Sequence, residues 1–397
     1  VAIMKNESPY VKEWLDYHLL AGVNHFYIYD NESSDNFKEV LQPYIDKNIV
    51  TYIFYPGKAR QYEAYNNAVL NYRFFCRYMA FIDADEFIFP QNNKSVIEVL
   101  EEILSDKKNA SGIVINWHNF GSNFQEKADY SRGVLERFTM RAENNDIHVK
   151  TITNPRRVDY FWSPHFAQYF FGTDAINEIG EIVENTMNNP PTVDKIVLNH
   201  YPHKSREEYE KKVSRGAADF IYNIYEKKPF THIYNDVFDD GIIKYRDGRE
   251  NFSVESSEDM QSRIFHALEE NLLSANPENL SKEFYKDKLE NFLVCLALSE
   301  KFQFKYEGRF LSEYALFWIY QTLHKNFAIP DLLLLFSELP RILKLPYPIV
   351  KEIHAACIKI IPMTIEFLRS YMKQTHIKDN WKKIMELKYL LEMLKIM

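Results

Sequence analysis

Apolar segments of strand length alternate with longer segments of helical periodicity along the first part of the chain. The apolar runs at residues 2–4, 26–29, 51–55 and 78–82 each predict a strand. Between them, residues three or four apart, such as Val11, Leu15 and Leu19, predict amphipathic helices. Strands that alternate with helices of this length are typical of βαβ units. We therefore expect an α/β domain with a mostly parallel, Rossmann-like sheet flanked by helices.

The pattern changes twice further along the chain. Residues 116–189 are less regular, and the alternation at 135–140 and 147–152 predicts two strands. A last strand is predicted at 195–198, before a helix that Ser205 and Glu208 open as a capping box. After residue 221 the strand signals fade. We predict an α/β domain at residues 1–221 and a mainly α-helical domain at residues 222–397.

Composition narrows the functional classes. The chain of 397 residues has a formal net charge of -8, which argues against nonspecific binding of nucleic acid because such binding needs a basic surface. Its three cysteines have neither a metal-binding spacing nor an even disulfide framework, and no apolar run reaches the length of a membrane span. These features favour the cytoplasm. Val1 already lies in a strand-like segment, which leaves open whether further residues precede it in the full protein.

The most informative segment is Asp83-Ala84-Asp85-Glu86, which follows an apolar run. Side chains two apart at a strand end point the same way, so Asp83 and Asp85 hold two negative charges within reach of one hard cation. An unpaired carboxylate beside a buried strand is costly, which favours a bound partner. Mg²⁺ or Mn²⁺ held by carboxylates and phosphate oxygens is the common arrangement. The segment therefore predicts a metal that bridges the protein and a diphosphate.

Polar clusters follow the other predicted strands as well. Asn6-Glu7, Asp30-Asn31 and Arg60-Gln61 come directly after strands, and ligands of parallel sheets bind at this edge. His200 lies just beyond the strand at 195–198, and we interpret it as a third metal ligand, with His203 as its rival.

Two aromatic residues end the strand after the acidic segment. The rings of Trp117 and Phe120 suit stacking on a sugar. The alternative interpretation is that Trp117 only fills the gap between the sheet and a loop.

Several motifs occur in the order found in one group of enzymes. Those before the acidic segment are Lys5-Asn6-Glu7, Tyr29-Asp30-Asn31 with Ser33, and Gln61 with Ala64-Tyr65-Asn66. Those after it are Trp117 with Phe120-Gly121-Ser122, Glu136-Arg137-Phe138, Lys150-Thr151-Ile152 and Asn199-His200-Tyr201. As an ordered set over about the first 220 residues, they make the chain resemble the glycosyltransferase family 2-like and family 92 enzymes.

The resemblance implies a GT-A fold, in which a divalent metal, usually Mn²⁺, holds the diphosphate of a nucleotide sugar. The residues that it places around the nucleoside are Asn6, Glu7, Asp30, Asn31 and Ser33, with Gln61 and Asn66 nearby. It also implies that Asp83 contacts ribose and metal, that Asp85 and His200 bind the metal, and that Lys204 faces the phosphates. The metal would neutralise the charge that develops on the departing nucleoside diphosphate.

Relatives of this kind are similar to inverting enzymes, which need a general base for the acceptor hydroxyl. Glu136 is our candidate because it lies in a matched motif on a predicted apolar strand, with Glu86 and Asp159 as alternatives. The structural alternative for Glu136 is an ion pair with Arg137 or Arg141.

These observations predict a metal-dependent bacterial glycosyltransferase of the cell envelope, which moves a sugar from a UDP-sugar to a glycan or a lipid-linked glycan with inversion. A sugar nucleotidyltransferase is a second interpretation, although Lys5-Asn6-Glu7-Ser8 is not the Gly-rich loop that it would carry. A non-catalytic glycan-binding protein of the same fold is a third. Near the end of the chain, lysines flank an apolar stripe that consists of Ile384, Leu387, Leu391 and Leu394. The stripe predicts either peripheral contact with a membrane or packing against its own domain or a second copy of the chain.

Overall fold

The computed structural model describes residues 1–249, except 74, 106, 108–109, 170–173 and 217–228, together with 305–306 and 309–310. The chain forms two compact units, Val1–Glu255 and Ser256–Met397. In the second unit, β15 (Lys305–Tyr306) pairs with β16 (Arg309–Phe310) in antiparallel fashion. The predicted boundary after residue 221 and the apolar stripe at 384–394 lie outside the described residues.

The first unit begins with the predicted alternation of strands and helices. Three parallel strands, in the order β1-β2-β3, are joined by two helices. These elements are β1 (Ala2–Met4), α1 (Ser8–Leu20), β2 (Phe26–Asp30), α2 (Phe37–Asp46) and β3 (Val50–Phe54). Gly22 ends the turn after α1 at a φ of +101°, a conformation that glycine adopts without strain. All three strands therefore end at one edge, as the sequence predicts for βαβ units.

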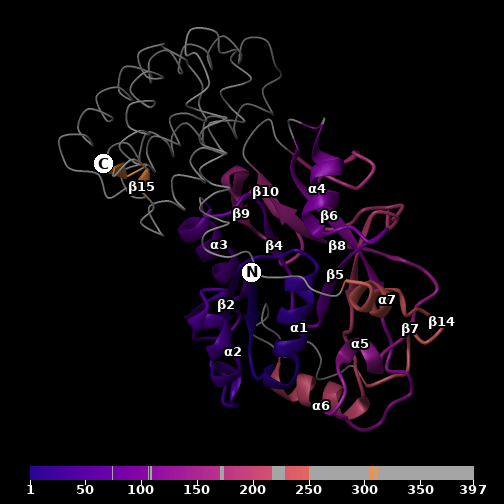
Figure 1. The fold of residues 1–397 in the computed structure, drawn as a ribbon. Coiled ribbons are helices and arrows are strands. Elements are labelled where there is room, and N and C mark those ends of the chain that lie inside the picture. Colours follow the sequence, from indigo (N-terminus) through magenta and orange to yellow (C-terminus); the bar gives the residue numbers. More distant parts are fainter. Residues whose placement is uncertain are drawn as a thin grey trace. The chain divides into compact units, whose positions relative to one another are not determined.

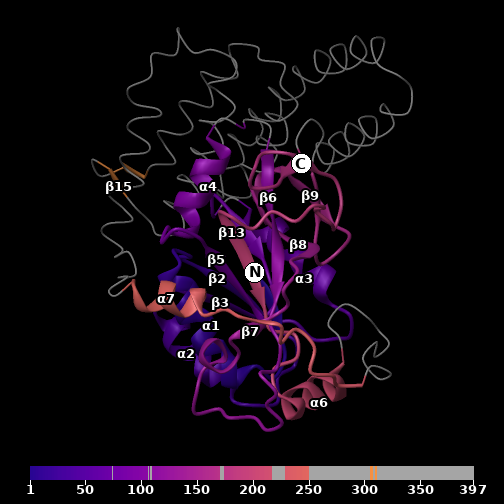
Figure 2. The ribbon, with the colours of Figure 1, turned by 90° about the vertical axis from the view of Figure 1, so that its right-hand side faces the viewer.

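A larger sheet continues beside β1. Its seven strands are β4 (Met79–Phe81), β5 (Glu86–Pro90), β6 (Ala110–Asn119), β8 (Asp146–Thr153), β11 (Asp174–Ile176), β12 (Ile182–Val183) and β13 (Ile196–His200). β6 lies parallel to β13 and antiparallel to β8 (Figure 2). It also lies parallel to β11, and β8 in turn pairs with β4. The backbone N–H of Ile82 donates to the Val1 carbonyl at 3.2 Å, so β4 lies next to β1. The mixed α/β architecture is confirmed.

Two apolar cores cover the two faces of these sheets. One lies against α1, α2, α4 (Val96–Leu104), α5 (Val134–Arg137) and α7 (Gly241–Asp247). The other lies against α3 (Gln61–Tyr72) and the hairpin of β9 (Val158–Phe161) and β10 (Ala167–Tyr169). α7, from beyond residue 221, places Ile242 and Tyr245 in the first core.

The segment at 135–140 differs from the predicted strand. It forms the short helix α5, followed by β7 (Met140–Arg141), which pairs with β14 (Val237–Phe238). Figure 1 shows α5, α7, β7 and β14 gathered on one side of the unit. Alternation alone misassigns this segment because Val134, Leu135 and Phe138 are buried by tertiary contacts at helical spacing. The predicted capping box of Ser205 and Glu208 is confirmed at the start of α6 (Arg206–Arg215), and Ser95 and Glu98 form another at the start of α4.

Candidate active site

Hydrogen bonds connect the loops that follow β1, β2 and β3. The backbone N–H of Asn6 donates to Ser33 Oγ at 3.0 Å, and the backbone N–H of Ser33 donates to Asp30 Oδ1 at 2.8 Å. The amide of Asn31 donates to the Tyr55 carbonyl, beyond the end of β3, at 2.9 Å. The structure thus brings together four of the residues predicted around the nucleoside. Because their hydrogen bonds link three loops, this edge of the sheet is already shaped without a ligand.

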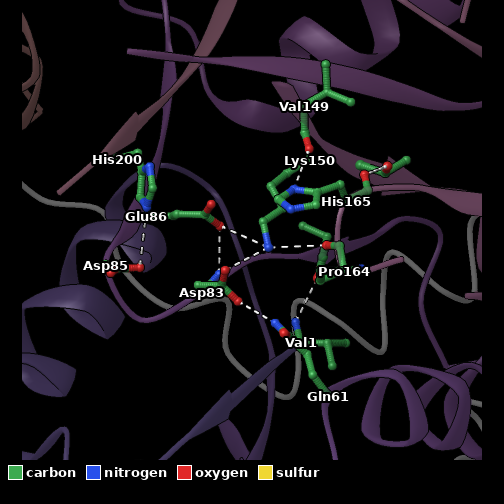
Figure 3. A network of polar contacts seen from close by, with 12 residues as sticks. Val1, Gln61, Asp83, Asp85, Glu86, Val149, Lys150, Pro164, His165 and His200 are labelled. Atoms are coloured by element: carbon green, nitrogen blue, oxygen red, sulfur yellow. Dashed lines mark hydrogen bonds and ion pairs between the residues drawn. The ribbon is translucent and has the colours of Figure 1, made fainter. Parts of the chain in front are cut away.

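Asp83 lies at the centre of a buried network at the end of β4 (Figure 3). Lys150 Nζ on β8 donates to Asp83 Oδ2 at 2.8 Å, and Gln61 Nε2 on α3 donates to Asp83 Oδ1 at 2.7 Å. Glu86 accepts the backbone N–H of Asp83 at 2.7 Å and lies 3.7 Å from Lys150 Nζ. Gln61, which the resemblance places near the nucleoside, thus contacts the acidic segment through Asp83.

Burial controls the charges in this network. The Glu86 side chain is fully buried, and burial raises its pKa well above the ordinary value even though Lys150 opposes the shift. Burial alone would lower the pKa of Lys150, but the nearby carboxylates of Asp83 and Glu86 outweigh burial and raise the pKa of the ammonium group. Lys150 is therefore charged and fixes the side chain of Asp83.

Asp85 faces a different set of partners. Its Oδ2 accepts from Lys212 Nζ of α6 at 2.6 Å, and its Oδ1 lies 3.9 Å from His200 Nε2 (Figure 3). His200 Nδ1 lies 2.9 Å from Asn119 Oδ1, and the amide of Asn119 donates to Asp146 Oδ2 at 2.7 Å. A carboxylate only accepts, which fixes the orientation of the amide. His200 Nδ1 must then carry the proton, and the Nε2 lone pair faces Asp85.

This pair of donors fits a divalent cation. Burial lowers the pKa of His200 to about 4, so its ring is neutral at pH 7 and two electron-pair donors face each other. Their separation of 3.9 Å is close to twice a metal–ligand distance of about 2.1 Å. Asp83, in contrast, has both carboxylate oxygens engaged by Lys150 and Gln61. Within the described part of the chain, no three His, Cys, Asp or Glu side chains are arranged as a complete metal site.

Basic side chains converge on the same place. Lys204 is buried at a φ of +54°, with its Nζ 4.7 Å from the centre of the Tyr10 ring, and burial lowers its pKa although Asp85 and Glu7 oppose the shift. Arg215 of α6 pairs with Glu7 at 2.6 Å. The charged side chains around the site are the cations Lys150, Lys204, Lys212 and Arg215 and the carboxylates Glu7, Asp83 and Asp85.

Other predicted residues have different surroundings. Asn66 clamps β9, because it donates to the Phe161 carbonyl at 3.1 Å and accepts the Phe161 N–H at 2.7 Å. Phe120 is fully buried and stacks on Tyr201, so its ring has no face open to a sugar.

Trp117 and His203 lie close to the predicted metal ligands. The Trp117 ring packs against His200, at 4.5 Å between ring centres, and against His148, at 5.7 Å. His203 stacks on Tyr234 instead of facing His200, and burial lowers its pKa to about 4.

Glu136, the predicted base, lies on α5 with 43% of its side chain exposed. Its ion-pair partner is Arg246 of α7, at 3.3 Å, and not Arg137 or Arg141. Arg137 forms a buried pair with Glu208, and Arg141 pairs with Asp239. Of the alternatives, Glu86 is fully buried and Asp159 lies on β9.

Sequence reasoning gave no role to Lys150 or Lys212. In the sequence, Lys150 is recognisable only as part of a matched motif, and Lys212 is only one of several charged residues on α6. Their roles depend on the packing of β8 and α6 against the acidic segment, which no local pattern records.

Comparison with known proteins decides the family. The sequence profile of glycosyltransferase family 92 matches residues 1–236. The chain belongs to glycosyltransferase family 92. A family 92 protein of Ricinus communis is 24% identical over 223 residues, which are 55% of this chain and 38% of that protein. Another from Oryza sativa subsp. japonica is 25% identical over 224 residues, 55% of this chain and 35% of its own length.

The family 92 chain thus spans less than two fifths of the length of these curated relatives. Because they come from plants, they do not support the predicted bacterial origin. Among solved structures, S. aureus TarS in complex with UDP is similar with a TM-score of 0.31 and 12% identity, over 95% of this chain and 91% of that chain. In the described residues, no helix is long and apolar enough to span a membrane.

Proposed function

We propose that this family 92 chain transfers a sugar from a UDP-sugar to a hydroxyl group of a glycan, with inversion and with Mn²⁺ or Mg²⁺ as cofactor. The observation that carries the proposal is the pairing of Asp85 with the fixed Nε2 lone pair of His200. The pair lies near the edge at which the parallel strands β1, β2 and β3 end. Two lysines, Lys204 and Lys212, lie close to Asp85. The combination suits a nucleoside, a cation and a diphosphate.

Each part of the site has a role in this proposal. The braced loops around Asp30 and Asn31 receive the nucleoside, while Asp85 and His200 hold the metal. Lys204 and Lys212 face the diphosphate, so that Lys212 exchanges its contact with Asp85 for one with phosphate. The bound metal supplies neutralisation of the charge that develops on the leaving nucleoside diphosphate.

The opposite charges of the two ligands give a direct test. A divalent cation and a diphosphate bound side by side neutralise part of each other's charge, so each favours binding of the other. We expect UDP to bind at least about tenfold more tightly with Mn²⁺ than without it, because the two ligands stabilise each other. Isothermal titration calorimetry with UDP, with and without Mn²⁺, measures this coupling.

Variants make the test specific. Asp85→Ala should abolish the Mn²⁺-dependent part of UDP binding, while Asp46→Ala, at the end of α2, is the control and should keep it. Equal Mn²⁺-dependent binding by Asp85→Ala and the control would refute the proposal. Assay of UDP release over a panel of UDP-sugars then identifies the donor.

The two other interpretations have their own readouts. Pyrophosphate release from a nucleoside triphosphate and a sugar phosphate would identify a sugar nucleotidyltransferase. Metal-independent glycan binding without UDP release would identify a non-catalytic protein of this fold.

A further inference from the structure

Asp146 and His148, at the beginning of β8, form a carboxylate–imidazole pair. Asp146 Oδ1 lies 2.7 Å from His148 Nδ1 and accepts the backbone N–H of His148 at 2.9 Å, while Asp146 Oδ2 accepts from the Asn119 amide at 2.7 Å. Burial alone would raise the pKa of Asp146, but its hydrogen bonds, chiefly from His148, hold that pKa below the ordinary value. The ionised carboxylate accepts the Nδ1 proton, so the lone pair of His148 is on Nε2.

The pair lies at the same edge of the sheet as the acidic segment. His148 and Lys150 are two residues apart on β8, so their side chains project from the same face, and Lys150 reaches Asp83 at 2.8 Å. The His148 ring stacks on Trp117 at 5.7 Å and 25°, and His200 packs against the same indole. His165, drawn beside Lys150 in Figure 3, lies 6.1 Å from the His148 ring.

His148 also has the exposure that a base for an incoming hydroxyl needs. Its side chain is 42% exposed, whereas that of Asp146 is 25% exposed and that of Glu86 is fully buried. Glu136 is exposed to a similar degree, but its carboxylate is held by Arg246. His148 therefore combines an accessible side chain, a fixed tautomer and contact with the same indole, Trp117, that His200 packs against.

We propose that His148, oriented by Asp146, is the general base that activates the sugar hydroxyl of the acceptor, an inference that rests on the proposed function. The acceptor oxygen forms a bond to the anomeric carbon of the donor as its proton passes to His148 Nε2. The bond between the anomeric carbon and the diphosphate oxygen breaks, and its electron pair leaves with UDP. The imidazolium, stabilised by Asp146, returns the proton to solvent before the next turnover.

The test separates binding from turnover in the full chain with Mn²⁺. UDP affinity is measured by calorimetry, and turnover by UDP release from the UDP-sugar that the donor panel selects, with a panel of free monosaccharides as acceptors and water alone as the blank. His148→Gln should keep UDP affinity within about twofold while UDP release falls about 10²- to 10⁴-fold. Asp146→Asn should lower UDP release as well, and added imidazole should restore part of the activity of His148→Ala.

His25→Gln is the matched control, because His25 lies at the opposite end of β2 and contacts Thr51. It should keep both UDP affinity and UDP release. Release by His148→Gln within threefold of the wild type, with UDP affinity intact, would overturn the proposal. So would loss of release in Glu136→Gln while His148→Gln retains it. A wild-type chain that binds no UDP would instead overturn the proposed function, and this inference with it.

Discussion

Arg137 and Glu208 form a buried ion pair that anchors α6, and its loss should be measurable as lost stability. The guanidinium donates to the two carboxylate oxygens at 2.9 and 2.7 Å, and the two side chains are only 1% and 2% exposed. α6 carries Lys212 and Arg215 into the candidate site, so the pair supports the chemistry without touching the ligands. The perturbation that we choose is Arg137→Met, which removes the charge and keeps most of the length.

The magnitude follows from what Glu208 retains. Removing one partner of a buried ion pair costs about 3–5 kcal/mol. Glu208 would still accept from Tyr10 Oη at 2.8 Å and from the backbone N–H of Ser205 at 3.0 Å, which places the cost near the lower end. We therefore expect about 3 kcal/mol, or a fall in Tm of about 6–12 °C for a unit of this size. Arg206→Met is the control, because its pair with Glu126 has side chains 44% and 54% exposed and should cost less than about 1 kcal/mol.

Urea unfolding followed by tryptophan fluorescence measures both variants. Burial alone would raise the pKa of Glu208, but Arg137 and Ser205 outweigh it and lower that pKa. A carboxylate with a lowered pKa contributes stability above its unfolded pKa, which is lost as the pH falls. The difference between wild type and Arg137→Met should therefore narrow below about pH 4. A loss equal to that of Arg206→Met, or a difference that does not change with pH, would refute this reasoning.

Three further predictions concern single residues. Gly121→Ala should cost about 1–3 kcal/mol in urea unfolding, because the added Cβ would lie 2.4 Å from the Tyr234 carbonyl oxygen, whereas Gly241→Ala meets its nearest atoms at 3.2 Å and should cost less. Lys212→Met should bind Mn²⁺ about tenfold more tightly in the absence of UDP, measured by electron paramagnetic resonance, because no ammonium then competes for Asp85. Burial lowers the pKa of His18 to about 3, so the stability that neutral His18 contributes is lost as the pH falls from about 6.5. His18→Gln should therefore make the midpoint of urea unfolding depend less on pH between pH 6.5 and pH 3.

The fold was predictable where local signals and tertiary structure agree. The first three strands and their helices follow directly from apolar periodicity, and Ser95 and Ser205 cap helices as their sequences indicate. The segment around Glu136 was assigned wrongly as a strand, because short alternation in a mixed segment does not distinguish a strand from one helical turn. Its surroundings come from α7, more than 100 residues later, and only tertiary packing determines them.

In the candidate site, too, the local sequence does not determine which side chains surround the two acids of one motif. Asp83 and Asp85 are two residues apart and were predicted to act together on one metal, yet their carboxylates face different partners. Lys150, 67 residues after Asp83, holds that carboxylate from β8, while Lys212, 127 residues after Asp85, holds the other from α6. The side-chain period of a strand gives the direction of the two acids but not the charges that β8 and α6 bring to each. Asp83 thus acts first through the network with Lys150 and Gln61, and Asp85 is the acid that faces His200, where we propose that the cation binds.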